Sequence, residues 1–437
     1  MSEGQLTGVS ISEASRVWAK IGVVSFGGPA GQIALMHRIV VEEKRWISEA
    51  RFLAALNFCM LLPGPEAQQL ATYVGWLLHG IRGGLIAGLL FILPGALVML
   101  GLSCLYLTVG DLPVLEGLFL GLKAAVVVIV AQAVIRIGGR SLGSARSRII
   151  ATTAFLAMFL WNVSFPWVIL AAALAGGLAM RAGPAAAQGE KAADYAGTAS
   201  RRGGPVLITG AAFLVLWLAP ALVLLLSLGE SHVFSQIAVF FSKMATVTFG
   251  GAYAVLSYVS QQAVDGFGWM TPEEMIDGLA LAETTPGPLI LVTQFVGFIA
   301  AYRDPGQLSP EVAGLIGASL TTWVSFAPCF LWIFVLAPHV ERLRRNPALA
   351  GALTGVTAAV VGVVINLALW FSVHVLFTSV LTFNRWGMRL EVPQWSTIQI
   401  VPTLIVLLIG LAVFRFRLGL LPALGIAALI GLVSTAL

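Results

Sequence analysis

The chain has 437 residues, of which 58% are hydrophobic and only 10% are charged, and its formal net charge is +5. A soluble domain carries about 25% charged residues, so this composition excludes an ordinary soluble protein and predicts one solvated by lipid. The basic residues form short clusters between apolar segments, as expected for cytoplasmic loops. The positive charge therefore does not predict a nucleic-acid partner.

The first two predicted elements, 14–41 and 50–79, are apolar stretches that glycine and proline interrupt. No signal peptide is expected before them, because the N-terminus lacks a basic start followed by an apolar core and a cleavage site. The interruptions are the first FGG break (Phe26–Gly28, followed by Pro29) and the first PGP break (Pro63–Pro65). Proline suits the first turn of a helix and glycine suits the turn before it, so each break predicts the start of a new helix.

Apolar runs long enough to cross a bilayer follow along the chain. A span needs roughly 20 apolar residues, and the runs lie at 85–108, 114–135, 206–228, 312–335, 349–371, 398–414 and 418–436. The three cysteines lie within apolar segments, so they are interpreted as plain helix residues, and neither a metal site nor a cofactor is predicted. The pattern predicts an all-α polytopic membrane protein.

An internal repeat divides the chain. The first FGG break recurs as the second FGG break (Phe249–Gly251), and the first PGP break recurs as the second PGP break (Pro286–Pro288) at the same offset along the chain. Trp46 and Trp269 match at that offset too. The predicted domains are an N-terminal half (1–181), a linker with a connecting transmembrane helix (182–230) and a C-terminal half (231–437).

The loop charges of the two halves are opposite. Segment 37–51 carries Arg38, Lys44, Arg45 and Arg51, whereas segment 259–274 has no Lys or Arg but carries Asp265, Glu273 and Glu274. Conversely, 109–116 is acidic, and its counterpart carries Arg342, Arg344 and Arg345. Because positive loops stay in the cytoplasm, the halves are predicted to be inverted in the membrane, with a cytoplasmic N-terminus and a periplasmic C-terminus. Arg385 and Arg389 fall on the predicted outer side and fit this assignment worst.

The same rule decides how the broken segments run. If 50–79 crossed the membrane once, the Arg-rich loop 136–148 would lie outside. The loop lies in the cytoplasm if segments 14–41 and 50–79 each enter the membrane, turn at their break and return to the same side. Each half is therefore predicted to contain two re-entrant helical hairpins, broken at FGG and PGP, followed by full transmembrane helices.

The breaks predict an anion site. Non-helical backbone at membrane depth survives only inside protein or against a water-filled cavity. Helices starting after Gly28, Gly251, Pro65 and Pro288 would each present unpaired N–H groups and about half a positive charge. The alternative is a set of structural kinks without a ligand, and the paired recurrence of the breaks favours a transport site.

A few charged residues are candidates for the same site. Lys20 and Lys243 are repeat partners, each shortly before its Ser/Thr-Phe-Gly-Gly, and buried lysines usually face a cavity or a partner. Snorkelling from a short hairpin is the alternative for both. Glu66 and Glu283 are the candidates for a coupling proton, although Glu66 could also be an ordinary complement of the helix dipole.

The predicted substrate-binding set combines the breaks with these charges. It comprises Lys20, Lys243, Phe26, Gly27, Gly28, Pro29, Pro63, Gly64, Pro65, Glu66, Gln68, Phe249, Gly250, Gly251, Thr285, Pro286, Gly287 and Pro288. No catalytic or metal-ligating residue is predicted.

These motifs resemble the chromate ion transporter (CHR) family in its long, two-domain form, over nearly the whole chain. The likeness is most specific in FGGPAGQIALMHR (26–38), in 45–76 and in the degenerate copies at 248–256 and 284–298. The resemblance implies a carrier of the bacterial inner membrane that expels chromate and confers resistance to it. By motif match it implies roles for both pairs of breaks, with Trp46, Glu66 and Gln68. The second FGG break departs from the pattern, because Ala252 replaces the proline.

Three classes of function compete. A secondary transporter of a tetrahedral dianion, either chromate or the near-isosteric sulfate, is favoured over an uncoupled anion channel. An enzyme lacks support, since no HExxH or P-loop motif is present. The missing nucleotide motif predicts that an ion gradient drives transport. A homodimer is left open.

Overall fold

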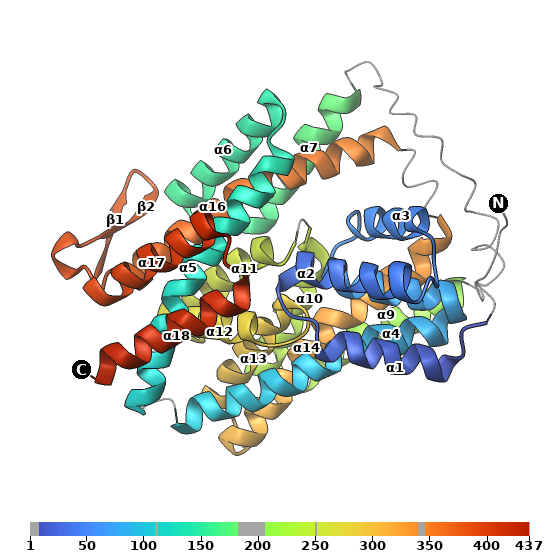
Figure 1. Cartoon of the computed structure of the whole chain (residues 1–437), viewed down its shortest axis with the longest axis horizontal. Coiled ribbons are helices and arrows are strands. Elements are labelled where there is room, and N and C mark those ends of the chain that lie inside the picture. Colours follow the sequence, from blue (N-terminus) through green and yellow to red (C-terminus); the bar gives the residue numbers. More distant parts are fainter. Residues whose placement is uncertain (1–7, 110–111, 182–205, 250, 340–345, 437) are drawn as a thin grey trace. The chain divides into compact units, whose positions relative to one another are not determined.

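The computed structural model describes residues 8–109, 112–181, 206–249, 251–339 and 346–436. Gly250, the arginines at 342–345 and most of the predicted linker lie outside these residues. In the N-terminal half the elements are α1 (Ile11–Val23), α2 (Gly28–His37), the π-helical turn η1 (Arg38–Glu43), α3 (Glu49–Cys59), α4 (Glu66–Val109), α5 (Pro113–Ser141), α6 (Ala145–Trp161) and α7 (Phe165–Arg181) (Figure 1).

The helix α9 (Val206–Leu228) precedes the C-terminal half. That half contains α10 (Val233–Val247), α11 (Ala252–Ser260), the π-helical turn η2 (Gln261–Gly266), α12 (Pro272–Thr284), the short turn η3 (Leu289–Leu291), α13 (Val292–Arg303), α14 (Pro310–Leu336), η4 (Ala337–His339), α16 (Pro347–Leu376), β1 (Val380–Arg385), β2 (Met388–Pro393), η5 (Trp395–Thr397), α17 (Ile400–Phe416) and α18 (Leu420–Ala436).

Elements of the two halves correspond. The turn η2 lies as many residues after η1 as the second FGG and PGP breaks lie after the first. The helices α17 and α18 follow α6 and α7 at a second common separation in the sequence, and they have the same lengths. The left-handed residue that ends α6, Asn162, recurs at the end of α17 as Arg417. The recurrence thus extends beyond the sequence motifs to element lengths and to the backbone conformation of a helix end.

Serine side chains start several of these helices. The hydroxyls of Ser10, Ser48 and Ser144 accept hydrogen bonds from backbone N–H groups in the first turns of α1, α3 and α6. Such caps satisfy donors that have no partner within the helix, and each stabilises its helix start by about 1 kcal/mol.

The helix α4 is a hairpin of two arms rather than one rod. Its backbone leaves the helical region at His79 and Gly80, and Gly80 has a φ of 64°. A methyl group at Gly75 would lie 2.4 Å from the carbonyl oxygen of Gly83, so the arms pack against each other through glycines. In the C-terminal half the corresponding pair is Gly297 of α13 and Gly317 of α14, where a methyl group at Gly317 would lie 2.4 Å from the oxygen of Gly297.

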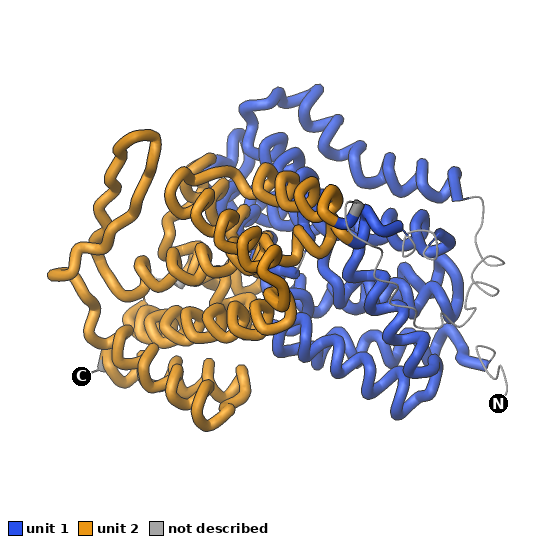
Figure 2. The backbone as a smooth tube through the Cα atoms, turned by 90° about the horizontal axis from the view of Figure 1, so that it is seen from above, with its two compact units in different colours: residues 1–100, 180–252, 285–350 blue, residues 101–179, 253–284, 351–437 orange. Residues whose placement is uncertain are grey.

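The described chain forms two compact units (Figure 2). Unit 1 comprises 1–100, 180–252 and 285–350, and unit 2 comprises 101–179, 253–284 and 351–437. Each unit therefore draws segments from both halves of the sequence.

Within unit 2 the two halves exchange equivalent contacts. Gly117 of α5 packs against Gly431 of α18, and Gly176 of α7 packs in the same way against Gly351 of α16. In the repeat, α5 corresponds to α16 and α7 corresponds to α18. Each of the two helix crossings therefore pairs one helix of the N-terminal half with one helix of the C-terminal half. The absence of side chains at these glycines lets the helix backbones approach closely.

Five helical stretches in the described residues are long and apolar enough to cross a membrane: Glu66–Thr108, which includes both arms of α4, Pro113–Ser141, Val206–Leu228, Pro310–His339 and Pro347–Leu376. The protein is therefore a multi-pass membrane protein. The helices α17 and α18, predicted as spans, have 17 residues each, as do α6 and α7. The sequence interpretation missed α6 and α7, which match α17 and α18 but contain the polar or small residues that shorten an apolar run.

A β-hairpin departs from the predicted all-α fold. Strands β1 and β2 pair antiparallel around Trp386 and Gly387, which have φ values of 52° and 73°. Two positive φ values in a two-residue loop are typical of a type I′ turn, whose twist suits a hairpin.

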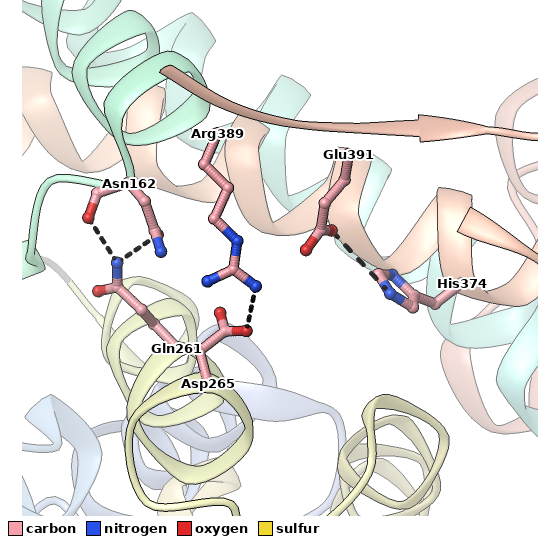
Figure 3. Close-up of polar contacts among 6 residues, drawn as sticks. All are labelled: Asn162, Gln261, Asp265, His374, Arg389 and Glu391. Carbon is pink, nitrogen blue, oxygen red and sulfur yellow. Dashed lines mark hydrogen bonds and ion pairs between the residues drawn. The ribbon is translucent and has the colours of Figure 1, made fainter. Parts of the chain in front are cut away.

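Polar contacts connect this hairpin to the helices of unit 2 (Figure 3). Arg389 of β2 donates a hydrogen bond to Asp265 of η2 over 3.0 Å, and His374 of α16 lies 4.0 Å from Glu391. The side chain of Gln261 donates to the backbone oxygen of Asn162 over 3.0 Å. Arg389, which fits the predicted orientation badly, is thus paired with Asp265 of η2.

Candidate anion site at the helix starts

Reciprocal hydrogen bonds join the four breaks inside unit 1. The backbone N–H of Gly64, in the first PGP break, donates to the oxygen of Thr248 over 2.7 Å. The N–H of Gly287, in the second PGP break, donates to the oxygen of Ser25 over 2.8 Å. Ser25 and Thr248 occupy the same position before the two FGG breaks, so each half binds the other through equivalent atoms.

Both central glycines adopt conformations that other residues rarely adopt. Gly64 has a φ of 127° and Gly287 a φ of 91°. A methyl group at Gly64 would lie 2.7 Å from Nε2 of Gln69 and 2.9 Å from Sγ of Cys329. At Gly287 the closest atom would be Cδ1 of Leu291, at 3.2 Å. Glycine is therefore required at Gly64 by both backbone conformation and space.

Buried glutamine amides hold the break segments in place. The Gln32 amide donates to the oxygen of Gly287 and, over 3.4 Å, to that of Ser25. The Gln69 amide donates to the oxygen of Pro63 over 2.7 Å. Both side chains are almost fully buried, so losing these bonds would leave backbone oxygens without partners.

A small pocket, of about 280 Å³ with its open mouth included, lies where the breaks meet. Residues that follow all four breaks line it: Pro29, Gln32, Pro65, Glu66, Ala67, Gly251, Ala252, Pro288, Leu289 and Ile290. The helices α2, α4 and α11 start at the pocket, and the fourth start is the short turn η3, which continues into α13.

This arrangement suits a small anion. The first turn of a helix contains N–H groups without partners in the helix, and the dipole makes that end positive. Within the described lining, Glu66 is the one charged side chain, and it lies in the first turn of α4, where a carboxylate is favoured. A ligand anion must therefore share the pocket with this carboxylate or with its protonated form.

Unpartnered acceptor atoms add to the polarity near the pocket. Within the described residues, Oε1 of Gln32, Gln68 and Gln69 receives no hydrogen bond. Nε2 of Gln68 donates to Oγ1 of Thr72 over 3.0 Å. Gln32, which lines the pocket directly, was not selected from the sequence, although it stands in the FGGPAGQ motif.

The other predicted charged residues lie elsewhere. Lys20 of α1 and Lys243 of α10 have exposed side chains and are not among the residues that line the pocket. Glu283 is buried at the end of α12 and accepts a hydrogen bond from the Tyr253 hydroxyl over 2.7 Å. Thr285 is also buried, while Phe26 and Phe249 are half-buried. In the described residues no cluster of side chains could hold a metal ion.

Comparison with known families decides what kind of protein carries this site. The sequence matches the chromate transporter family over 12–177 and again over 235–432. The chain belongs to the chromate transporter family. The two matched regions begin at the same offset from each other as the FGG and PGP breaks.

Two chromate transport proteins resemble the chain over most of its length, and a shorter transporter resembles part of it. A chromate transport protein of Pseudomonas aeruginosa is 36% identical over 79% of this chain and 77% of its own. A chromate transport protein of Cupriavidus metallidurans is 30% identical over 79% of this chain and 78% of its own. An uncharacterized transporter of Bacillus subtilis, YwrA, is 31% identical over 36% of this chain but 89% of its own. No solved structure matches the chain significantly.

Proposed function

We propose that this chromate transporter is a secondary active carrier that exports chromate across the bacterial inner membrane and so gives chromate resistance. The observation that carries the proposal is the convergence of four helix starts on one pocket within unit 1. Family membership and relatives named for chromate transport support the choice of anion. Sulfate is close to chromate in shape and charge, and it is the natural competitor to test.

The reciprocal bonds between the breaks support a repeat with two-fold symmetry. When residue i of one half contacts residue j of the other and the reverse also holds, the halves are related by an approximate two-fold axis. The opposite loop charges favour an axis in the membrane plane, and hence inverted halves at 1–181 and 231–437 with a connecting segment between them. Each half then contributes two re-entrant hairpins, one turning at its FGG break and one at its PGP break.

In this proposal the anion binds through backbone N–H groups at the helix starts. The break residues from Phe26 to Pro29, Pro63 to Pro65 and Thr285 to Pro288, together with Phe249 and Gly251, shape the pocket, and Gln68 supports it from the buried side. Because the amides are fixed in space before the anion arrives, little reorganisation is needed on binding. A site that binds through backbone N–H groups rather than through a cationic side chain can also release its anion to either side of the membrane.

The charged residues have distinct proposed roles. Glu66 occupies the positive pocket of the empty carrier, and it must be protonated or displaced when the anion binds, which makes it a candidate for coupling. Glu283, buried against Tyr253, is the second candidate. Lys20 and Lys243, which are exposed, would attract the anion from solution rather than contact it in the pocket.

The proposed topology has a cytoplasmic N-terminus and a periplasmic C-terminus in the inner membrane. With this topology the basic loops 37–51 and 136–148 both lie in the cytoplasm. A cysteine introduced at Arg140 should then be labelled by an impermeant thiol reagent only in inverted vesicles.

Uptake of labelled chromate into inverted membrane vesicles tests the function. Vesicles that contain the protein should accumulate chromate when an ion gradient is imposed, and vesicles that contain Gly64→Leu should not. Unlabelled sulfate in excess should compete if the site recognises tetrahedral dianions. Equal chromate uptake with and without the protein would refute the proposal.

A further inference from the structure

A second cavity, of about 1460 Å³ with its open mouth included, lies wholly within unit 2. It runs along one face of α5, where Glu116, Phe119, Leu120 and Lys123 follow one another at helical spacing. Glu273, Glu274 and Asp277 of α12 line it from another element, together with Tyr106 of α4 and His374 of α16. The cavity thus joins polar and titratable groups of four helices.

The charge of this lining excludes the transported anion. Four carboxylates face one lysine and one histidine, so the net formal charge is negative with histidine neutral. A cavity lined by charge of one sign concentrates ions of the opposite sign. Chromate is repelled here, whereas protons and other cations are attracted.

One ion pair in this cavity contains a buried carboxylate. Nζ of Lys123 lies 3.4 Å from Oδ1 of Asp277, whose side chain is 8% exposed. The Tyr106 hydroxyl donates to Oδ2 of Asp277 over 3.0 Å. Within the described residues Oδ1 accepts no hydrogen bond, so this buried oxygen has room for a proton.

The pair also lies deep along the helix. Lys123 is separated from the start of α5 at Pro113 by about 15 Å of helix. A hydrocarbon core is about 30 Å thick, so with the start of α5 at the membrane surface, as the proposed topology has it, Lys123 would lie near the middle of the core. Glu116 lies about two turns closer to the start of α5, on the same face.

Resting on the proposed function, we propose that the Lys123–Asp277 pair is the proton-binding site that couples chromate export to proton entry. A proton taken from the cavity neutralises the Asp277 carboxylate and frees the Lys123 ammonium from its partner. Asp277 lies on α12, which is followed directly in the chain by Thr285 and the second PGP break, so a change at the pair can reach the pocket through one helix.

The groups around the pair fit the uptake of a proton. Glu273 and Glu274 in the first turn of α12 and Glu116 on α5 provide carboxylate acceptors along the cavity, and His374 on α16 adds an imidazole. Tyr106 on α4 stabilises the charged form of Asp277 by its hydrogen bond. The repeat equivalents of Lys123 and Asp277 are Thr357 and Ala54, so the other half has no such pair.

The test uses the purified full chain reconstituted in liposomes, with two measurements on each variant. Exchange of labelled for unlabelled chromate without a gradient reports binding and translocation, and the rise in chromate flux on imposing a pH gradient reports coupling. The variants are Asp277→Asn and the double variant Lys123→Met with Asp277→Asn, which leaves no unpaired buried charge. The exposed Glu230→Gln is the matched control, and Glu283→Gln tests the competing acid.

In wild type and Glu230→Gln we expect the pH gradient to raise chromate flux several-fold. In Asp277→Asn and in the double variant we expect exchange to persist and the rise to disappear, with Glu283→Gln still responding. If Asp277→Asn fails to insert into the liposome membrane, the double variant alone tests the proposal. The proposal is overturned if the double variant still responds to the gradient, or if it loses exchange as well, because the pair would then serve transport or folding itself.

Two results for the wild type separate this inference from the proposed function. Exchange that no pH gradient accelerates would overturn the proton site and leave chromate transport standing. Absence of both exchange and gradient-driven flux would refute the proposed function, and the proton site with it.

Discussion

In unit 1 the pocket is lined by equivalent positions of the two halves. In unit 2 the cavity is lined by charged groups from both halves, and Lys123 and Asp277 have no charged equivalent in the other half. The pocket is formed mainly by backbone and apolar side chains, with Glu66 as its charge. The cavity contains several carboxylates, a lysine and a histidine. In the proposed carrier this difference is a division of labour: the symmetric pocket binds the anion and faces each side of the membrane in turn, and the asymmetric cavity takes up a proton that enters from one side.

The symmetric pocket depends most on the glycines of the PGP breaks. Gly64→Leu should abolish transport, because a left-handed conformation costs a side chain about 1–2 kcal/mol and this side chain would also collide with Gln69 and Cys329. Gly287→Leu should be milder, since the closest atom there is the end of a flexible side chain. Chromate uptake per inserted protein measures both, and Gly139→Leu, at a position with no neighbouring atom, is the control. Equal effects of Gly64→Leu and Gly139→Leu would contradict this account.

The next largest effect is expected at Gln32. Gln32→Leu removes a buried donor from the oxygen of Gly287, and an unsatisfied buried acceptor costs about 1–3 kcal/mol. We expect a lower melting temperature in detergent together with reduced chromate exchange. Gln236→Leu, which removes an exposed bond to Ser231, should leave both unchanged. An unchanged melting temperature for Gln32→Leu would show that this bond does not hold the breaks together.

Neutralising the pocket's carboxylate should improve binding. Glu66→Gln removes a negative charge that competes with the anion for the helix starts, an interaction of about 0.3–1 kcal/mol at exposed sites and up to ~2 kcal/mol at partly buried ones. We expect a KM for chromate that is lower by a few-fold, with Glu42→Gln as the exposed control. A higher KM in Glu66→Gln would mean that the carboxylate assists binding instead.

The exposed lysines should have smaller effects that depend on salt. Lys20→Ala and Lys243→Ala should raise the KM for chromate at low ionic strength and have little effect at high ionic strength, because solvent screens exposed charges. Lys44→Ala, which removes an exposed ion pair with Glu13, is the control. Complete loss of chromate exchange at every salt concentration would place these lysines in direct contact with the anion.

The smallest effect is expected at the hairpin of unit 2. Arg389→Ala and Asp265→Ala each break one partly exposed ion pair, a contact worth about 0–1 kcal/mol. We expect a small change in melting temperature and unchanged chromate exchange, with the double variant no worse than either single one. A large loss of exchange would show that the hairpin takes part in transport.

The sequence predicted the helix starts well, because their signals are local. Proline and glycine punctuate apolar runs at Gly28, Glu66 and Ala252, and the structure starts helices at those residues. It did not predict the hairpin at 380–393, where the turn signal, Trp386-Gly387, is weaker than the usual Asn-Gly or Asp-Gly.

The contacts between distant segments could not be predicted from spacing. Asp277 and Lys123 are far apart in the sequence and the repeat gives neither a charged counterpart, so nothing in the pattern pairs them. Lys20 and Lys243 do match across the repeat, yet their side chains are exposed rather than in the pocket. A repeat shows which positions are equivalent, but the direction of a side chain depends on tertiary packing.

Equilibrium binding of labelled chromate to the purified protein tests the anion pocket most directly. Ala67 is buried and lines the pocket, whereas Ala171 of α7 is exposed in unit 2. We predict that Ala67→Phe, whose ring would fill the pocket, loses saturable chromate binding, and that Ala171→Phe binds like wild type. Wild-type chromate affinity in a correctly folded Ala67→Phe protein would contradict the account.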